Sequence, residues 1–151
     1  MFPIPIAVFA DGRTSLIHSK GVIAPAQADV ILVVEDDLPT RKLFRAALRA
    51  EGYAVVTAGD GIDALTYLET HTPSAVVLDL GLPRLHGRDV LDEMASDGLT
   101  QQIPIIVVTG ERIDHLDTSQ FACVVQKPVS PDELVATVRQ CLTRRTARGA
   151  I

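Results

Sequence analysis

From residue 30 onward, short apolar runs rich in Val, Ile and Leu alternate with longer stretches in which apolar residues recur every three or four positions. The short runs are typical of buried strands, and the longer stretches predict amphipathic helices. We expect the strands at residues 30–34, 54–58, 75–79, 104–108 and 122–126. The helices are expected near 39–51, 61–70, 87–97 and 131–144, with a shorter one at 112–118.

Local signals agree with this division. The stretch 130–133, Ser-Pro-Asp-Glu, predicts a capping box with proline at the first helical position. Gly52 is placed to end the first helix. Strands that alternate with helices imply parallel pairing, because each helix returns the chain to the edge at which the next strand begins. The pattern therefore predicts an α/β fold with a doubly wound, five-stranded parallel sheet.

The two ends of the chain do not follow the repeat. Residues 1–28 contain two short β-prone pieces, 6–9 and 15–17, between prolines and glycines. A loosely ordered tail, an extra hairpin and a start site assigned too far upstream all fit that pattern. We expect an N-terminal extension at 1–28, one domain at 29–143 and a basic C-terminal tail at 144–151.

Composition limits the class of protein. Of the 151 residues, 47% are hydrophobic but only 4% aromatic, so aliphatic side chains must build the core, as in a buried parallel sheet. The net charge of −5 argues against a nucleic-acid-binding surface. Cys123 and Cys141 have no metal-ligand spacing and are expected to be reduced core thiols. Neither a signal peptide nor a membrane span is predicted, and we expect a cytoplasmic protein.

Polar residues stand where the predicted strands end. Asp36 and Asp37 follow the first strand, Asp79 ends the third, and Thr109 and Lys127 follow the last two. The carboxyl ends of parallel strands meet at one edge of the sheet, where ligands of such folds bind. We therefore expect these five side chains to lie close together.

This set of residues is suited to phosphoryl chemistry. A carboxylate can accept a phosphoryl group only if the negative charge is offset, and Mg²⁺ or Mn²⁺ does this with oxygen ligands. Asp37 and Asp79 are candidate ligands, Asp36 can hold the waters of the ion, and Gly81 can offer its backbone carbonyl. Lys127 supplies a fixed positive charge, and the Thr109 hydroxyl can hydrogen-bond a phosphoryl oxygen. Alternatively, the Asp36–Asp37 pair begins a turn and caps the first helix.

Four motifs together resemble the receiver domain of two-component response regulators. They are Val-Val-Glu-Asp-Asp at 33–37, Val-Val-Leu-Asp-Leu-Gly-Leu-Pro at 76–83, Val-Val-Thr-Gly at 107–110 and Lys-Pro at 127–128. The resemblance covers about residues 29–143. It implies a flavodoxin-like sheet of order 2-1-3-4-5. It also implies a cis peptide bond between Lys127 and Pro128.

The resemblance also implies a role for each site residue. Asp79 matches the phosphoacceptor, Asp36 and Asp37 the acidic pair for magnesium, Thr109 with Gly110 the switch and phosphate-binding position, and Lys127 the basic partner. The implied function is a phosphorylation-dependent signalling switch and not an enzyme. The implied partners are a histidine kinase or a histidine phosphotransfer protein, and a downstream protein that the sequence does not identify. No nucleic-acid or membrane partner is expected.

Two departures from the family pattern concern the output of the switch. Receivers usually carry Tyr or Phe three residues before the lysine, where this chain has Val124. The stretch between Thr109 and Lys127 is also short, which predicts a brief or mobile fourth helix. Both features resemble an atypical stand-alone subgroup of receivers.

Two alternative functions remain open at this point. A pseudo-receiver would keep the fold as an interaction module that does not depend on phosphorylation. A phosphatase would use Asp79 as a nucleophile. Enzymes of the haloacid dehalogenase type need a second aspartate two residues after the nucleophile, and this chain has Gly81 there.

Overall fold

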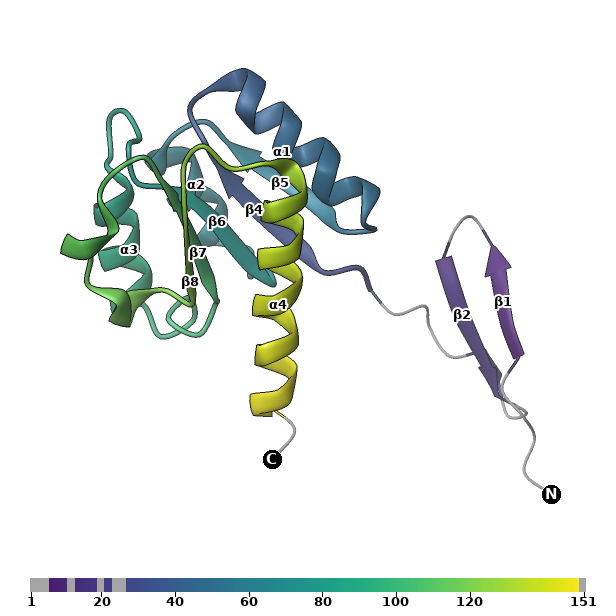
Figure 1. Ribbon diagram of the computed structural model, residues 1–151. Coiled ribbons are helices and arrows are strands. Elements are labelled where there is room, and N and C mark those ends of the chain that lie inside the picture. The colour runs from purple at the N-terminus through teal and green to yellow at the C-terminus, as the bar shows by residue number, and fades with distance from the viewer. Residues whose placement is uncertain (1–5, 11–12, 19–20, 23–26, 150–151) are drawn as a thin grey trace.

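The computed structural model describes residues 6–10, 13–18, 21–22 and 27–149. Its main feature is a five-stranded parallel sheet in the order β5-β4-β6-β7-β8 (Figure 1). The strands are β4 (Val30–Val34), β5 (Ala54–Ala58), β6 (Ala75–Asp79), β7 (Ile105–Thr109) and β8 (Cys123–Gln126). Numbered from β4, this order is 2-1-3-4-5, which confirms the expected fold.

Helices cover both faces of the sheet. They are α1 (Leu38–Ala50), α2 (Gly61–Leu68), α3 (Gly87–Ser96) and α4 (Pro131–Gly149). Helices α1 and α4 pack on one face, and α2 and α3 on the other (Figure 1). Residues alternate between the two faces along each strand, so Ile31 and Val33 join the core under α1 and α4, whereas Leu32 and Val34 join the other. Because both faces are buried, the strands read as continuous apolar runs.

The expected helix boundaries are close to those observed. Gly52, with φ of +94°, follows the last turn of α1 and ends it as predicted. Helix α4 begins at the predicted Pro131, and the hydroxyl of Ser130 accepts a hydrogen bond from the Glu133 N–H. This helix continues to Gly149 and does not end near Arg144, because no helix-breaking residue precedes Gly149.

The segment between β7 and β8 contains no α-helix. Two short 3₁₀ turns, η1 (Ile113–His115) and η2 (Thr118–Gln120), replace the helix expected at 112–118, and neither contains a buried residue. Between β7 and β8, where the structure describes every residue, the connection is therefore made by turns and not by the expected helix.

The described parts of the N-terminal segment form a sheet of their own. Strands β1 (Ile6–Ala10), β2 (Arg13–His18) and β3 (Gly21–Val22) pair antiparallel in that order and join none of the parallel strands. The described residues do not include 1–5, 11–12, 19–20 and 23–26 of the expected extension, nor 150–151 of the expected tail. Among the helices that the structure describes, none has both the length and the apolar character needed to cross a membrane.

Candidate functional site

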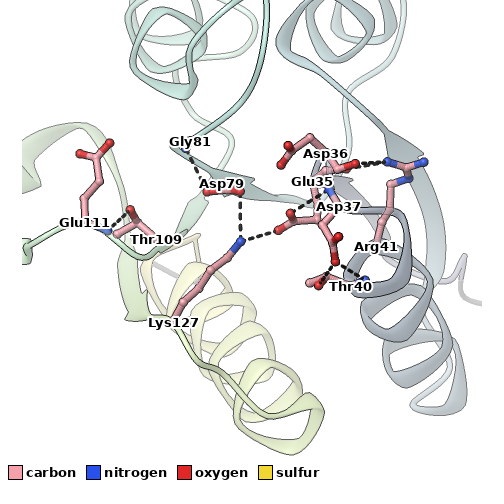
Figure 2. Close-up of polar contacts among 10 residues, drawn as sticks. All are labelled: Glu35, Asp36, Asp37, Thr40, Arg41, Asp79, Gly81, Thr109, Glu111 and Lys127. Atoms are coloured by element: carbon pink, nitrogen blue, oxygen red, sulfur yellow. Dashed lines mark hydrogen bonds and ion pairs between the residues drawn. The ribbon is translucent and has the colours of Figure 1, made fainter.

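The expected site residues lie at the carboxyl edge of the parallel sheet (Figure 2). Asp79 is the last residue of β6 and is 6% exposed. Thr109 is the last residue of β7 and is fully buried. Lys127 directly follows β8. The parallel register places these three strand ends side by side, since Asp79 pairs with Val108 and Thr109 with Gln126.

Lys127 connects two carboxylates of the site. Its ammonium donates hydrogen bonds to Oδ2 of Asp79 at 3.1 Å and to Oε2 of Glu35 at 3.0 Å. Glu35, the residue directly after β4, is only 2% exposed. A buried carboxylate is costly unless it is paired, and Lys127 supplies that pairing for Glu35 and Asp79 together.

The charges of this group are coupled. Burial raises the pKa of Glu35 above its usual range, the hydrogen bond from Lys127 opposes this rise, and the neighbouring Asp79 charge adds to it. Burial lowers the pKa of Lys127, but its hydrogen bonds to Glu35 and Asp79 outweigh burial and leave that pKa raised. Lys127 therefore stays positively charged throughout the neutral range.

The structure groups three carboxylates that can hold a metal ion. Glu35, Asp36 and Asp79 each offer an oxygen, and these atoms lie within 4.8 Å of one another. Two of the three side chains are buried, and Asp36 is exposed to solvent. Carboxylate oxygens gathered at one point are the donor set that Mg²⁺ or Mn²⁺ prefers, so the residues present fit such an ion.

Asp37 does not belong to this carboxylate group. Its side chain accepts a hydrogen bond from the Thr40 N–H at 3.0 Å and a second one from the Thr40 hydroxyl, and so caps α1 (Figure 2). The hydroxyl and then the N–H of Thr40 lower the pKa of Asp37. The acidic pair beside Asp79 is therefore Glu35 with Asp36, and not Asp36 with Asp37. The sequence Asp-Leu-Pro-Thr at 37–40 holds the signal for this role, because proline near the start of a helix favours a cap just before it.

Arg41 also belongs to the site, although it was not among the residues expected there. Its Nη1 donates to the backbone carbonyl of Glu35 at 2.7 Å and to that of Asp36 at 3.4 Å. From the first turn of α1 it therefore reaches back over the strand end. This contact holds the backbone of the two acidic residues in place (Figure 2).

The loop after β6 is packed tightly against Asp79. The Gly81 N–H donates to Oδ1 of Asp79 at 3.0 Å. A Cβ on Gly87 would lie 2.5 Å from the backbone oxygen of Asp79 and 2.6 Å from Cα of Leu80, so only glycine fits there. Arg84, in a left-handed conformation with φ of 62°, forms an ion pair with Asp60 at the start of α2. The loop is therefore anchored at both ends.

Thr109 is linked to the segment that follows it. Its hydroxyl oxygen accepts a hydrogen bond from the Glu111 N–H at 3.0 Å, and its backbone oxygen accepts one from the Lys127 N–H at 2.8 Å. Gly110 lies between Thr109 and Glu111, and a Cβ added to it would have no neighbouring atom within 4 Å. The Lys127–Pro128 peptide bond is cis, as the family resemblance implied. Val124 is half-buried and packs against the core under α2 and α3.

Comparison with known proteins identifies the family. Residues 31–139 match the response regulator receiver domain, and the chain belongs to this family. Response regulator MprA of Mycobacterium sp. (strain KMS) is 39% identical over 122 residues, which are 78% of this chain and 51% of MprA. The chain thus spans about half the length of the curated relatives it matches. Receiver domains are the signalling modules of two-component systems, and they partner histidine kinases.

Solved structures support the same assignment. The receiver domain of a putative LuxO repressor from Vibrio parahaemolyticus matches with a TM-score of 0.74 and 26% identity, over 82% of this chain and 96% of its own. The receiver domain of the sensor histidine kinase PA1611 from Pseudomonas aeruginosa matches with a TM-score of 0.70 and 27% identity, over 78% and 99% of the two chains. That domain holds a magnesium ion in its active-site cleft.

Proposed function

We propose that this receiver is a phosphorylation-dependent switch that accepts a phosphoryl group on the carboxylate of Asp79. The observation that carries the proposal is the position of Asp79, bonded to Lys127 at 3.1 Å and grouped with Glu35 and Asp36 at the sheet edge. This arrangement provides a carboxylate nucleophile, a fixed positive charge and oxygen ligands in one place.

The donor is a phosphohistidine on a histidine kinase or a histidine phosphotransfer protein. A carboxylate oxygen of Asp79 attacks the phosphorus, a P–O bond forms, and the P–N bond to histidine breaks. The electron pair of that bond stays on the imidazole nitrogen of the donor. The product is an aspartyl phosphate, and attack by water on it later restores the carboxylate and resets the switch.

The residues around Asp79 have separate tasks in this reaction. Lys127 holds the carboxylate in place before transfer and offers its N–H groups to phosphoryl oxygens afterwards. The Gly81 N–H fixes the other carboxylate oxygen. Thr109 ends the neighbouring strand, where Val108 pairs with Asp79, and its hydroxyl would donate its hydrogen to the new group.

Asp36 and Asp79 would hold Mg²⁺ or Mn²⁺, with Glu35 beside them and the backbone carbonyl of Gly81 as a further ligand. When bound, the ion offsets the charge of the incoming phosphoryl oxygens. Glu35 takes the place first expected for Asp37, because its carboxylate lies in the group and that of Asp37 caps α1. Arg41 holds the backbone from which Glu35 and Asp36 project.

The added phosphoryl group brings roughly −1.5 to −2 charges to the sheet edge. That charge is sufficient to change the hydrogen bonds of Thr109 and of the segment after it, and a downstream protein reads the change. We therefore assign the output to protein contact, with the downstream partner unidentified.

The test is incubation of the purified protein with Mg²⁺ and acetyl phosphate, followed by intact-mass spectrometry. The expected result is a gain of one phosphoryl group that Asp79→Asn abolishes and that EDTA prevents. Asp132→Asn, which removes an exposed aspartate of α4 away from the site, is the matched control and retains the gain. No gain in the wild type would overturn the proposal and favour a phosphorylation-independent interaction module.

A further inference from the structure

The segment between β7 and β8 is tied to α3 by two polar contacts. Nη2 of Arg88 lies 2.7 Å from Oε2 of Glu111, and Nε2 of Gln120 donates to Oδ1 of Asp92 at 2.9 Å. Arg88 and Asp92 are four positions apart on α3 and so lie on the same side of this helix. The segment is thus held against α3 near both of its ends.

One of these contacts leads directly to the switch hydroxyl. The backbone N–H of Glu111 donates to Oγ1 of Thr109, whereas the carboxylate of the same residue pairs with Arg88 (Figure 2 shows the bond to Thr109). Glu111 therefore contacts the switch threonine through its backbone and α3 through its side chain. Two polar contacts among three residues, Thr109, Glu111 and Arg88, thus connect the hydroxyl to α3.

Arg88 and Glu111 differ in how tightly their surroundings are packed. Arg88 follows Gly87, which is packed onto the backbone of Asp79 and Leu80 without room for a Cβ, so the first turn of α3 is fixed to β6. Glu111 lies in a segment of turns without an α-helix, and a Cβ built on the preceding Gly110 would have no neighbouring atom within 4 Å. Of the two partners in the ion pair, Glu111 therefore lies in the less constrained segment, and Arg88 on the firmly packed helix.

Val124 cannot provide this link. It is half-buried against the core under α2 and α3, where the partly buried Leu116 and Phe121 also pack. Its short β-branched side chain has a single, restricted χ1 and no hydroxyl, so it has no large alternative position to adopt.

We infer that Glu111, through its ion pair with Arg88, is the positioning residue that transmits the state of Thr109 to α3 and to residues 110–122. This inference rests on the proposed phosphorylation of Asp79. When the Thr109 hydroxyl turns to donate to a phosphoryl oxygen, its oxygen still accepts the Glu111 N–H. Glu111 is carried along, its carboxylate moves away from Arg88, and the segment is held to α3 only near its other end, by the Gln120–Asp92 hydrogen bond among the contacts described above.

The test is hydrogen exchange measured by mass spectrometry on peptides covering 110–122 and 87–96, with and without Mg²⁺ and beryllofluoride. Beryllofluoride mimics the phosphoryl group, and ¹⁹F NMR measures its binding to each variant separately. The variant is Glu111→Gln. Its matched control is Asp114→Asn, which removes a carboxylate from the exposed Arg112–Asp114 pair of the same segment without touching Thr109 or Arg88.

Beryllofluoride is expected to accelerate exchange at 110–122 in the wild type and in Asp114→Asn. Without beryllofluoride, peptides covering 110–122 should already exchange roughly two- to fivefold faster in Glu111→Gln than in the wild type. An exposed ion pair shifts a local opening equilibrium by up to about that factor. Beryllofluoride should then add little. The charge swap Arg88→Glu with Glu111→Arg should restore part of the response, which a purely structural role of either residue would not produce.

Two contrary results are distinct. If Glu111→Gln binds beryllofluoride and its exchange changes as much as in the wild type, the inference is overturned and the proposed function stands. If the wild type itself binds no beryllofluoride, the proposed phosphorylation site fails, and the inference fails with it.

Discussion

The ammonium of Lys127 lies 3.1 Å from Oδ2 of Asp79, although 48 positions separate the two residues in the chain. The contact exists because β6 and β8 end at the same edge of a parallel sheet, with β7 between them. The same ammonium also bonds to Glu35 at 3.0 Å. One lysine therefore compensates two buried carboxylates, and the protonation of this group depends on it.

Replacement of Lys127 by Met is expected to lower the free energy of unfolding at neutral pH by about 1–3 kcal/mol, because Glu35 and Asp79 lose their common partner. The loss should depend on pH. Without the hydrogen bond from Lys127, which lowers the pKa of Glu35, that pKa rises further above its ordinary 4.5. A raised folded-state pKa contributes stability that is present below the unfolded value and is lost as pH rises through the folded value.

Urea unfolding across a pH series measures this effect. The Lys127→Met variant should lose more stability than the wild type between about pH 4.5 and neutrality. Adding Glu35→Gln to the variant is the control, since it removes the titrating group and should bring the two pH profiles back toward parallel. Parallel profiles of wild type and Lys127→Met would show that the Lys127–Glu35 bond does not set the pKa of Glu35.

Asp36 and Asp37 are neighbours with the same charge but are expected to give opposite results. Asp36→Ala should raise the Mg²⁺ concentration needed for half-maximal phosphorylation by at least about tenfold, because a ligand is lost. Asp37→Ala should leave that Mg²⁺ concentration nearly unchanged. It should lower the melting temperature by roughly 2–8 °C, because α1 loses its cap. Magnesium titrations with acetyl phosphate and differential scanning calorimetry separate the two effects. A tenfold rise in the Mg²⁺ concentration needed by Asp37→Ala would show that Asp37 is a ligand.

These two residues also mark the limit of what the sequence could predict. The strands were predictable from apolar runs that are buried on both faces, such as Val76 to Leu78. The order of the strands in the sheet came from the resemblance to receiver domains. The sequence showed three acidic residues after β4, but it did not show which of them point toward Asp79. That depends on where β4 ends and on the capping of α1 by Asp37, which leaves Glu35 as the buried carboxylate.

The segment before β8 illustrates a second limit. Its shortness was visible in the sequence, and the helix expected at 112–118 was replaced by the turns η1 and η2, which bury no side chain. The polar ties of this segment to α3 were not predictable, because Arg88 and Glu111 are 23 positions apart and meet only through the packing of the sheet.

Gly87→Ala should test how firmly α3 is fixed to β6. The new methyl group would meet backbone atoms of Asp79 and Leu80, which cannot move aside as a flexible side chain would. The expected cost is about 1–3 kcal/mol of unfolding free energy in urea. Gly98→Ala is the matched control, because the nearest atom to its Cβ is the Gln101 side chain at 4.0 Å, and its effect should stay within about 0.5 kcal/mol. Equal stability of the two variants would contradict this packing.

The most direct test of the central claim is to trap the phosphorylated residue. The protein is treated with Mg²⁺ and acetyl phosphate and then with sodium borohydride, which reduces an aspartyl phosphate to homoserine. Peptide mapping by tandem mass spectrometry then locates the change. Homoserine at position 79 is the predicted result. Homoserine at Asp36 or another acidic residue, or none at all, would contradict the assignment of Asp79 as the phosphoacceptor.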